Sequence, residues 1–238
     1  MTGPWPEWLA RWDRFQEAYV PGRELQFRLI ADYLGLLQAS SVLDLCAGPG
    51  SFGSRLLGEL PEAHIVAVDH DPWLLELGRR AAPHAEEITW IDADLREEWR
   101  AALPEERFDA VVATTALQWF DDGEVERIYS EVAQLAPTLV TSDLAPTGSE
   151  EACDLARLAT QRQRARGDDH WVDFWADARA DPAFATLLTE RDRRFAGRRP
   201  LPARPLEFHD RALRTAGFAD VTEIWRHGEH AILLARRN

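Results

Sequence analysis

A chain of 238 residues, 45% of them hydrophobic, is long enough to bury one sizeable core. Its formal net charge of -14 at pH 7 would repel a phosphate backbone, so we expect no nucleic-acid partner. The two cysteines, Cys46 and Cys153, lie far apart and have no Cys or His at metal-ligand spacing, so neither a disulfide framework nor a metal site is indicated. No run of about 18 apolar residues and no apolar signal segment occurs, so we expect a cytoplasmic protein that enters no membrane.

The first 37 residues predict two helices on either side of the break Val20-Pro21-Gly22. Aromatic residues at spacings of three and four form one apolar helical face, made of Trp5, Trp8, Trp12 and Phe15. We therefore expect residues 1–37 to be a helical cap that packs against the core.

Residues 38–147 alternate short apolar or β-branched runs with amphipathic stretches, a pattern typical of βαβ units and a parallel sheet. The runs predict strands at 41–45, 64–69, 88–91, 110–113 and 138–142. The stretches between them predict helices at 52–59, 73–81, 96–102 and 123–135.

Residues 148–207 are too long for a bare loop, and Asp181-Pro182 is typical of a helix start, so we expect a helical lid insertion. Its arginines are interleaved with acidic and apolar residues, which is typical of a solvated helix face: Arg191, Arg193, Arg194, Arg198 and Arg199. In the last segment, 208–238, a helix at 211–216 ends at Gly217 and strands at 221–225 and 231–235 form a hairpin.

The segment 42–50 (VLDLCAGPG) joins a buried strand to a glycine turn and then a helix. Gly48 and Gly50 let the backbone approach a ligand closely, because a Cβ would collide with it. Asp44, two residues before the turn, suits a cationic amino group or the amides of the loop. The segment resembles the first motif of the class I S-adenosylmethionine (SAM)-dependent methyltransferases, an acidic residue before a Gly-x-Gly-x-Gly turn. Cys46 departs from that motif, since it stands where the first glycine belongs.

Gly48-x-Gly50-x-x-Gly53 also fits the dinucleotide fingerprint, so the turn alone leaves two cofactors open. Asp69, at the end of the second predicted strand, suits ribose hydroxyls in both families. His70 follows it and is placed to lie against an adenine.

The third strand ends in residues 91–95 (IDADL), which resemble the position where the methyltransferases bind adenine. There Asp94 would take the adenine amino group, and the amide of Leu95 would meet the ring. Residues 108–119 (FDAVVATTALQW) resemble the fourth motif of the family, including its Leu-x-Trp ending. Four motifs in the correct order, followed by a C-terminal hairpin, favour SAM over NAD.

The resemblance covers about residues 40–145 and 208–238. It implies an α/β fold, a Rossmann-like doubly wound sheet that is mostly parallel and seven-stranded with an antiparallel C-terminal strand. N-terminal helices and a helical lid insertion would complete one methyltransferase domain. SAM would lie across the carboxyl ends of the strands. The implied cofactor-binding residues are Arg23, Asp44, Ala47, Gly48, Gly50, Asp69, His70, Asp94, Leu95 and Thr114.

Such an enzyme aligns an acceptor with the electrophilic S–CH3 group and excludes water. Core packing is the usual role of tryptophan, but four aromatic residues are candidates for an acceptor pocket: Tyr19, Trp119, Trp171 and Trp175. His209 and His170 are weak candidates for a catalytic base, although a histidine beside Asp210 at a helix start is more often a cap or a surface group. The sequence marks no base clearly, and it does not indicate the oligomeric state.

The acceptor we expect is a small molecule. Some nucleic-acid amino-methyltransferases carry Asn or Asp, Pro-Pro and an aromatic residue after the fourth strand, and residues 113–116 (ATTA) replace that motif here. One alternative is an NAD-dependent oxidoreductase that uses Gly48, Gly50, Gly53 and Asp69, but it leaves Asp44 and Asp94 without a purpose. The other is a member of the fold that binds SAM without methylating, since fold and cofactor do not fix the reaction.

Overall fold

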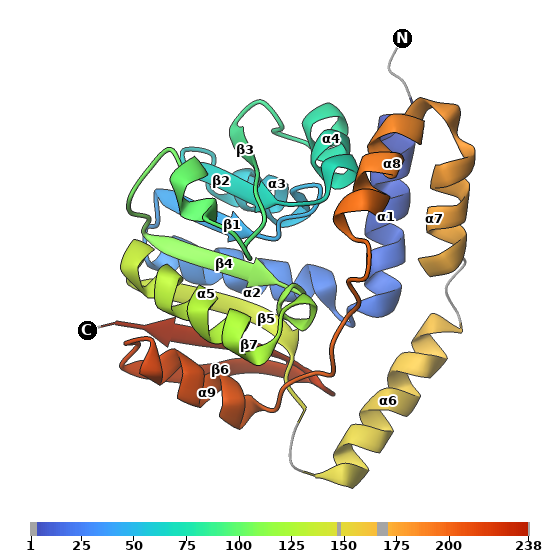
Figure 1. The fold of residues 1–238 in the computed structure, drawn as a ribbon. Coiled ribbons are helices and arrows are strands. Elements are labelled where there is room, and N and C mark those ends of the chain that lie inside the picture. The colour runs from blue at the N-terminus through green and yellow to red at the C-terminus, as the bar shows by residue number, and fades with distance from the viewer. Residues whose placement is uncertain (1–3, 147–148, 166–170, 238) are drawn as a thin grey trace.

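The computed structural model describes residues 4–146, 149–165 and 171–237. Its centre is a seven-stranded sheet with the order β3-β2-β1-β4-β5-β7-β6 (Figure 1). The strands are β1 (Ser41–Leu45), β2 (His64–Asp69), β3 (Ile88–Asp92), β4 (Ala110–Thr114), β5 (Thr138–Leu144), β6 (Asp220–His227) and β7 (His230–Arg236). The strand order reverses beside β1, and open α/β sheets bind ligands at such a switch point.

Strands β1 to β5 pair in parallel, and β7 runs antiparallel to both β5 and β6. The carboxyl ends of the parallel strands therefore share one edge, and the C-terminal hairpin extends the sheet beside β5. The predicted Rossmann-like doubly wound sheet with an antiparallel C-terminal strand is confirmed.

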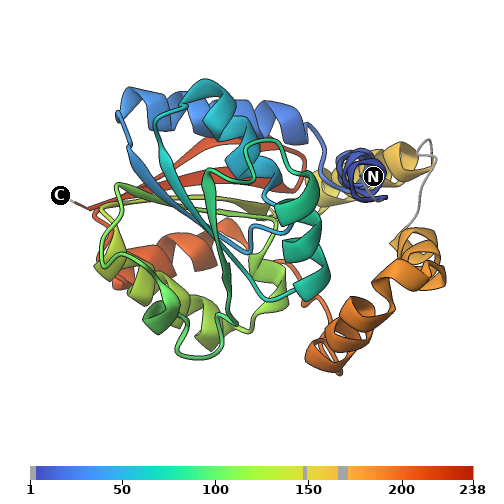
Figure 2. The same cartoon turned by 90° about the horizontal axis from the view of Figure 1, so that it is seen from above.

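Two layers of helices cover the sheet, as the view from above shows (Figure 2). Side chains alternate along β1, so Leu43 and Leu45 pack beneath α5 (Asp122–Leu135) and α9 (Leu206–Thr215). Val42 belongs to the opposite face, under α2 (Arg23–Leu36) and α3 (Ser51–Glu59). Because both faces are covered, the central strands β1, β2 and β4 are mostly apolar and buried, as expected for a parallel sheet.

A third group of helices lies beside the sheet: α1 (Trp5–Tyr19), α6 (Glu150–Arg164), α7 (Trp171–Ala180), η3 (Pro182–Phe184) and α8 (Ala185–Arg194) (Figure 1). Helix α4 (Pro72–Ala81) connects this group to the sheet through Trp73, which is fully buried. The Trp73 ring lies 5.9 Å from Trp8, 5.9 Å from Phe174 and 5.5 Å from Phe184. The apolar face predicted for the first helix thus packs into an aromatic cluster, in which edge-to-face pairs add to the free energy of burial.

Two predicted helices differ from the structure. Residues 96–102 form only a short 3-10 helix, η1 (Trp99–Ala102), because the Asp94 side chain accepts the N–H of Arg96 and holds the preceding residues in a turn. The last helix begins at Leu206, after Pro205, and not at residue 211. Phe208 and His209 are therefore buried inside its first turn. No helix in the described part of the chain is both long and apolar enough to cross a bilayer.

Candidate functional site

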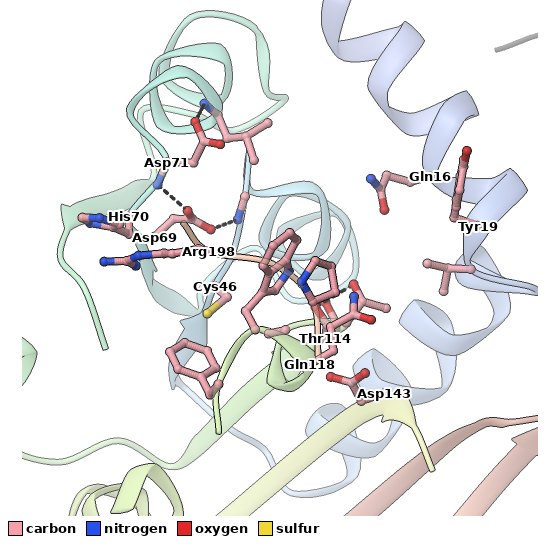
Figure 3. Close-up of a pocket in the computed structure, with 18 of the residues that line it drawn as sticks. Gln16, Tyr19, Cys46, Asp69, His70, Asp71, Thr114, Gln118, Asp143 and Arg198 are labelled. Carbon is pink, nitrogen blue, oxygen red and sulfur yellow. Dashed lines mark hydrogen bonds between the residues drawn. The ribbon is translucent and has the colours of Figure 1, made fainter. Parts of the chain in front are cut away.

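The turn after β1 bends sharply where the glycine motif was predicted. Cys46, Gly48 and Gly50 have φ of 55°, 57° and 68°, in the left-handed region that favours glycine. Gly50 is the residue directly before α3, and its N–H donates to the Ala47 carbonyl at 3.0 Å. A Cβ on Gly50 would overlap the indole ring of Trp90, so glycine is required there for packing as well as for φ. Cys46 takes the same conformation with a side chain, which places its thiol on the cavity wall (Figure 3).

Asp69, at the end of β2, connects this turn to the next loop. Its Oδ2 accepts the N–H of Gly48 at 2.7 Å, and its Oδ1 accepts the N–H of Asp71 at 2.7 Å (Figure 3). Burial and the charge of Asp71 nevertheless raise the pKa of Asp69 to about 6. The carboxylate therefore orients the glycine turn while it lies at the cavity wall.

Asp44 is buried within β1, with 1% of its surface exposed. Neither carboxylate oxygen has a hydrogen-bond partner among the residues described. Burial and the charge of Asp69 raise the pKa of Asp44 to about 8. A buried carboxyl group without a partner costs free energy. A positive charge or a hydrogen-bond donor placed near Asp44 would therefore be favourable.

Asp94 follows β3 and accepts two donors, the N–H of Arg96 at 3.1 Å and the guanidinium of Arg198 at 2.6 Å. Burial would raise the pKa of Asp94, but these hydrogen bonds hold it below its ordinary value. The His70 ring is close, with Nε2 3.7 Å from the Asp94 carboxylate. Burial lowers the pKa of His70. The carboxylates of Asp69 and Asp94 thus lie along one edge of the sheet, at the ends of β2 and β3.

A cavity of about 610 Å³ opens at this edge. Its wall combines the turn after β1 and the ends of β2, β4 and β5 with side chains from α1, α6, α7 and α8. Figure 3 shows part of this wall, including Gln16 and Tyr19 of α1. Ligand pockets usually measure roughly 300–1,000 Å³ and are lined mainly by apolar groups with a few placed polar ones. The residues described include no group of three side chains suited to hold a metal ion.

Residues 42–137 match the family model of a methyltransferase domain. The matched residues are less than half of the chain, and over them the chain is similar to the methyltransferase domain of the class I SAM-dependent enzymes. It is 33% identical over 117 residues to a trans-aconitate 2-methyltransferase of Azoarcus sp. strain BH72, covering 48% of this chain and 43% of that one. It is 37% identical over 102 residues to the same enzyme of Enterobacter sp. strain 638, covering 43% and 36%. The chain thus matches less than half the length of these relatives.

Solved structures share the fold. An O-methyltransferase family protein from Burkholderia thailandensis superposes with a TM-score of 0.59 at 17% identity, covering 90% of this chain and 56% of that one. Human N-acetylserotonin methyltransferase in complex with SAM gives a TM-score of 0.57 at 14% identity, covering 89% and 51%. At these identities the likeness extends to the fold alone.

Most of the residues predicted for the methyltransferase site lie on the cavity wall. They are Gly48, Asp69, His70, Asp94, Leu95 and Thr114 among the cofactor candidates, and Tyr19, Trp119, Trp171 and Trp175 among the acceptor candidates. Asp44, Ala47 and Gly50 lie in or directly beneath the turn and do not line the cavity. His170 lies outside the described residues.

Arg23, which the resemblance implies as a cofactor-binding residue, does not point into the cavity. It is buried at the start of α2, donates to Asp13 at 3.0 Å and lies 4.6 Å over the Phe27 ring. Its guanidinium therefore fixes α1 against α2 in this structure and does not line the cavity.

His209 likewise does not line the cavity. Its Nδ1 lies 2.8 Å from the Tyr129 hydroxyl, between α9 and α5, and 3% of its surface is exposed. Burial and the charge of Arg204 lower the pKa of His209 to about 4. The prediction that placed this histidine ahead of the last helix was wrong, because the helix begins at Leu206.

Sequence reasoning missed how the arginine run contributes to the wall. Arg191 pairs with Asp71 at 2.6 Å and Arg198 with Asp94 at 2.6 Å, so α8 and the segment after it close over the ends of β2 and β3. Phe195, between them, lies 5.7 Å from the His70 ring. The interleaving of these arginines with acidic and apolar residues predicts a solvated face, and nothing in their spacing identifies partners more than 100 residues away.

Proposed function

We propose that this protein transfers the methyl group of SAM to a small-molecule acceptor held in the cavity. The observation that carries the proposal is the meeting of the glycine turn with Asp69 and Asp94 at one edge of the sheet. Gly48 brings backbone to the wall, and the two carboxylates lie where ribose and adenine groups of the cofactor would meet them.

Asp44 distinguishes SAM from NAD. Its buried, unpartnered carboxyl lies beneath the turn and off the cavity wall, so it would attract the cationic amino group of a methionine moiety seated over the turn. NAD has no amino group of this kind to offer. Asp94 suits the adenine amino group, which SAM and NAD share, so the distinction rests on Asp44. The residues present therefore fit SAM better than the alternative of an NAD-dependent oxidoreductase.

The acceptor enters from the side of α1, α6 and α7, and we propose that residues 1–37 and 148–207 act as its cap and lid. The cavity volume of about 610 Å³ lies within the usual range for ligand pockets. A net charge of -14 makes nucleic acid a poor partner for the surface as a whole.

The bound cofactor supplies an electrophilic methyl group on a sulfonium. The chain aligns the acceptor with it and excludes water through the helices that close the cavity. Asp143, at the end of β5, lines the cavity, and its carboxylate accepts the N–H groups of Leu117 and Leu144 at 2.7 Å each. Burial raises the pKa of Asp143, so this carboxylate can take a proton when the attacking atom carries one.

The test is a calorimetric titration of the full chain with SAM, S-adenosylhomocysteine (SAH) and NAD. We expect SAM and SAH to bind and NAD not to bind. Asp69→Ala should weaken SAH binding by about 1.5–3 kcal/mol, since charge-assisted hydrogen bonds are lost. Asp92→Ala is the matched control, because Asp92 also ends a strand of this edge but does not line the cavity. Binding of NAD alone, or unchanged SAH affinity in Asp69→Ala, would refute the proposed site.

A further inference from the structure

The charges on the cavity wall leave no surplus positive charge. Among the residues described, the wall holds four arginines against five carboxylates. Each arginine already has an acidic partner in the chain: Arg96 with Glu124 at 2.8 Å, Arg157 with Asp154 at 2.9 Å, Arg191 with Asp71 at 2.6 Å and Arg198 with Asp94 at 2.6 Å. When the cofactor takes Asp94, only Arg198 is released, so an acceptor with several negative charges would still have to break the other pairs. Breaking a pair is costly where its partners are buried, as in the pair of Arg191 with Asp71.

Aromatic rings form the acceptor side of the wall. Trp12 and Tyr19 come from α1, and Trp171 and Trp175 come from α7. The Tyr19 hydroxyl accepts the N–H of Trp171 at 3.1 Å, so the two helices hold these rings together. Trp175 is already covered by the Arg191 guanidinium, 3.7 Å from its ring centroid, whereas Trp171 remains 37% exposed. Trp171 is therefore the ring of this group with most surface left to offer a ligand.

Two glutamine side chains provide uncharged polar groups on the same cavity wall as the aromatic rings. Gln16 of α1 and Gln118 of η2 (Leu117–Trp119) both line the cavity, and the close-up shows them on different sides of the same space (Figure 3). Within the described chain, neither side-chain amide makes a hydrogen bond. An amide both donates and accepts without charge, so it suits a hydroxyl or carbonyl substituent.

We propose that the methyl acceptor is an uncharged aromatic compound with a polar ring substituent. It would stack against Trp171 and Tyr19 and take hydrogen bonds from Gln16 and Gln118. The inference rests on the proposed function, and it differs from the polycarboxylate acceptor that the names of the curated relatives would suggest. The segments that carry these rings, α1 and α7, lie outside the matched residues 42–137.

Binding to the SAH-saturated full chain tests this inference with three probes, by calorimetry and saturation-transfer NMR. The probes are 2-naphthol, its saturated analogue decahydro-2-naphthol and trans-aconitate. We expect 2-naphthol to bind about 3–10-fold more tightly than the saturated alcohol, the range that aromatic pairing provides. Trans-aconitate should not bind. Tighter binding of trans-aconitate, equal binding of the two alcohols, or no binding of 2-naphthol would each overturn the inference.

A matched pair of variants locates the contact. Trp171→Leu keeps the site apolar but removes the ring, so the preference for 2-naphthol over its saturated analogue should fall to about onefold. Val172→Ala changes the exposed neighbour, which does not line the cavity, and should leave the preference unchanged. SAH affinity is measured in every sample. If the unmodified chain does not bind SAH, the proposed function is refuted. If it binds SAH but does not prefer 2-naphthol over the saturated alcohol, only the proposed acceptor class is refuted.

Discussion

Arg198 holds Asp94 through a hydrogen bond of 2.6 Å, although the two residues are more than 100 positions apart in the sequence. We propose that Asp94 accepts a hydrogen bond from the adenine amino group of the cofactor. In this structure the Arg198 guanidinium takes the position of that amino group. The Asp94 side chain is only 6% exposed, and Arg198 is 24% exposed. A pair this sheltered is worth more than a surface ion pair.

Arg198→Gln should therefore bind SAH more tightly, by about 3–10-fold, because the ligand no longer has to displace a charge-assisted hydrogen bond. Calorimetric SAH titrations measure the change. Arg193→Gln is the control, since Arg193 pairs with Glu190 and is 71% exposed. Weaker SAH binding by Arg198→Gln would show that the arginine contacts the cofactor and does not compete with it.

Asp44 should link SAM binding to pH. Its pKa of about 8 lies above the unfolded value, so the folded, unliganded chain binds the extra proton and loses stability as the pH rises from about 4 to 8. Asp44→Asn should raise the free energy of unfolding at pH 8 by about 1–3 kcal/mol, and yet weaken SAH binding at least about tenfold. Urea unfolding and calorimetry measure the two effects.

Thr141→Val provides the comparison for Asp44→Asn. The Thr141 hydroxyl is also buried in the sheet without a hydrogen-bond partner among the residues described. Its removal should stabilise the fold slightly and leave SAH affinity unchanged. Equal SAH affinity in Asp44→Asn and the unmodified chain would contradict the proposed role of Asp44.

His209 should make the protein sensitive to acid without affecting ligand binding. Its folded pKa of about 4 lies below the unfolded value, so the unfolded state takes up the proton first and stability is lost as the pH falls from about 6.5 to 4. The loss should be about 2–3 kcal/mol in urea unfolding, and it should be absent in His209→Gln. SAH affinity at pH 7.5 should be the same in both proteins. A large loss of SAH binding in His209→Gln would instead place this histidine in the functional site.

Gly50 should tolerate no side chain. Gly50→Ala needs a left-handed alanine whose Cβ overlaps Trp90, so we expect a loss of more than about 2 kcal/mol in the free energy of unfolding. Gly58→Ala, near the end of the same helix, meets no neighbouring atom and should gain about 0.5–1 kcal/mol. Thermal unfolding compares the two. Similar melting temperatures would mean that the turn after β1 relaxes freely.

The sequence alone was sufficient for the parallel part of the sheet and for the cofactor edge. Apolar runs predicted β1 to β5 within a few residues, because strands covered on both faces leave a continuous hydrophobic signal. Asp69 and Asp94 could be placed together because the carboxyl ends of parallel strands share one edge. The glycine turn could be identified because its left-handed conformations restrict which residues occur there, even though Cys46 departs from the pattern.

Only the tertiary structure decided where the outer segments lie. The ion pairs of Arg191 with Asp71 and of Arg198 with Asp94, and the stacking of α1 on α7, join residues more than 100 positions apart. Helical periodicity shows which face of α1 is apolar but not what covers it. The same limit explains Arg23 and His209, whose burial against Asp13 and Tyr129 follows from the packing of neighbouring helices. Local patterns encode elements and their turns, whereas long-range pairing depends on packing that no single segment contains.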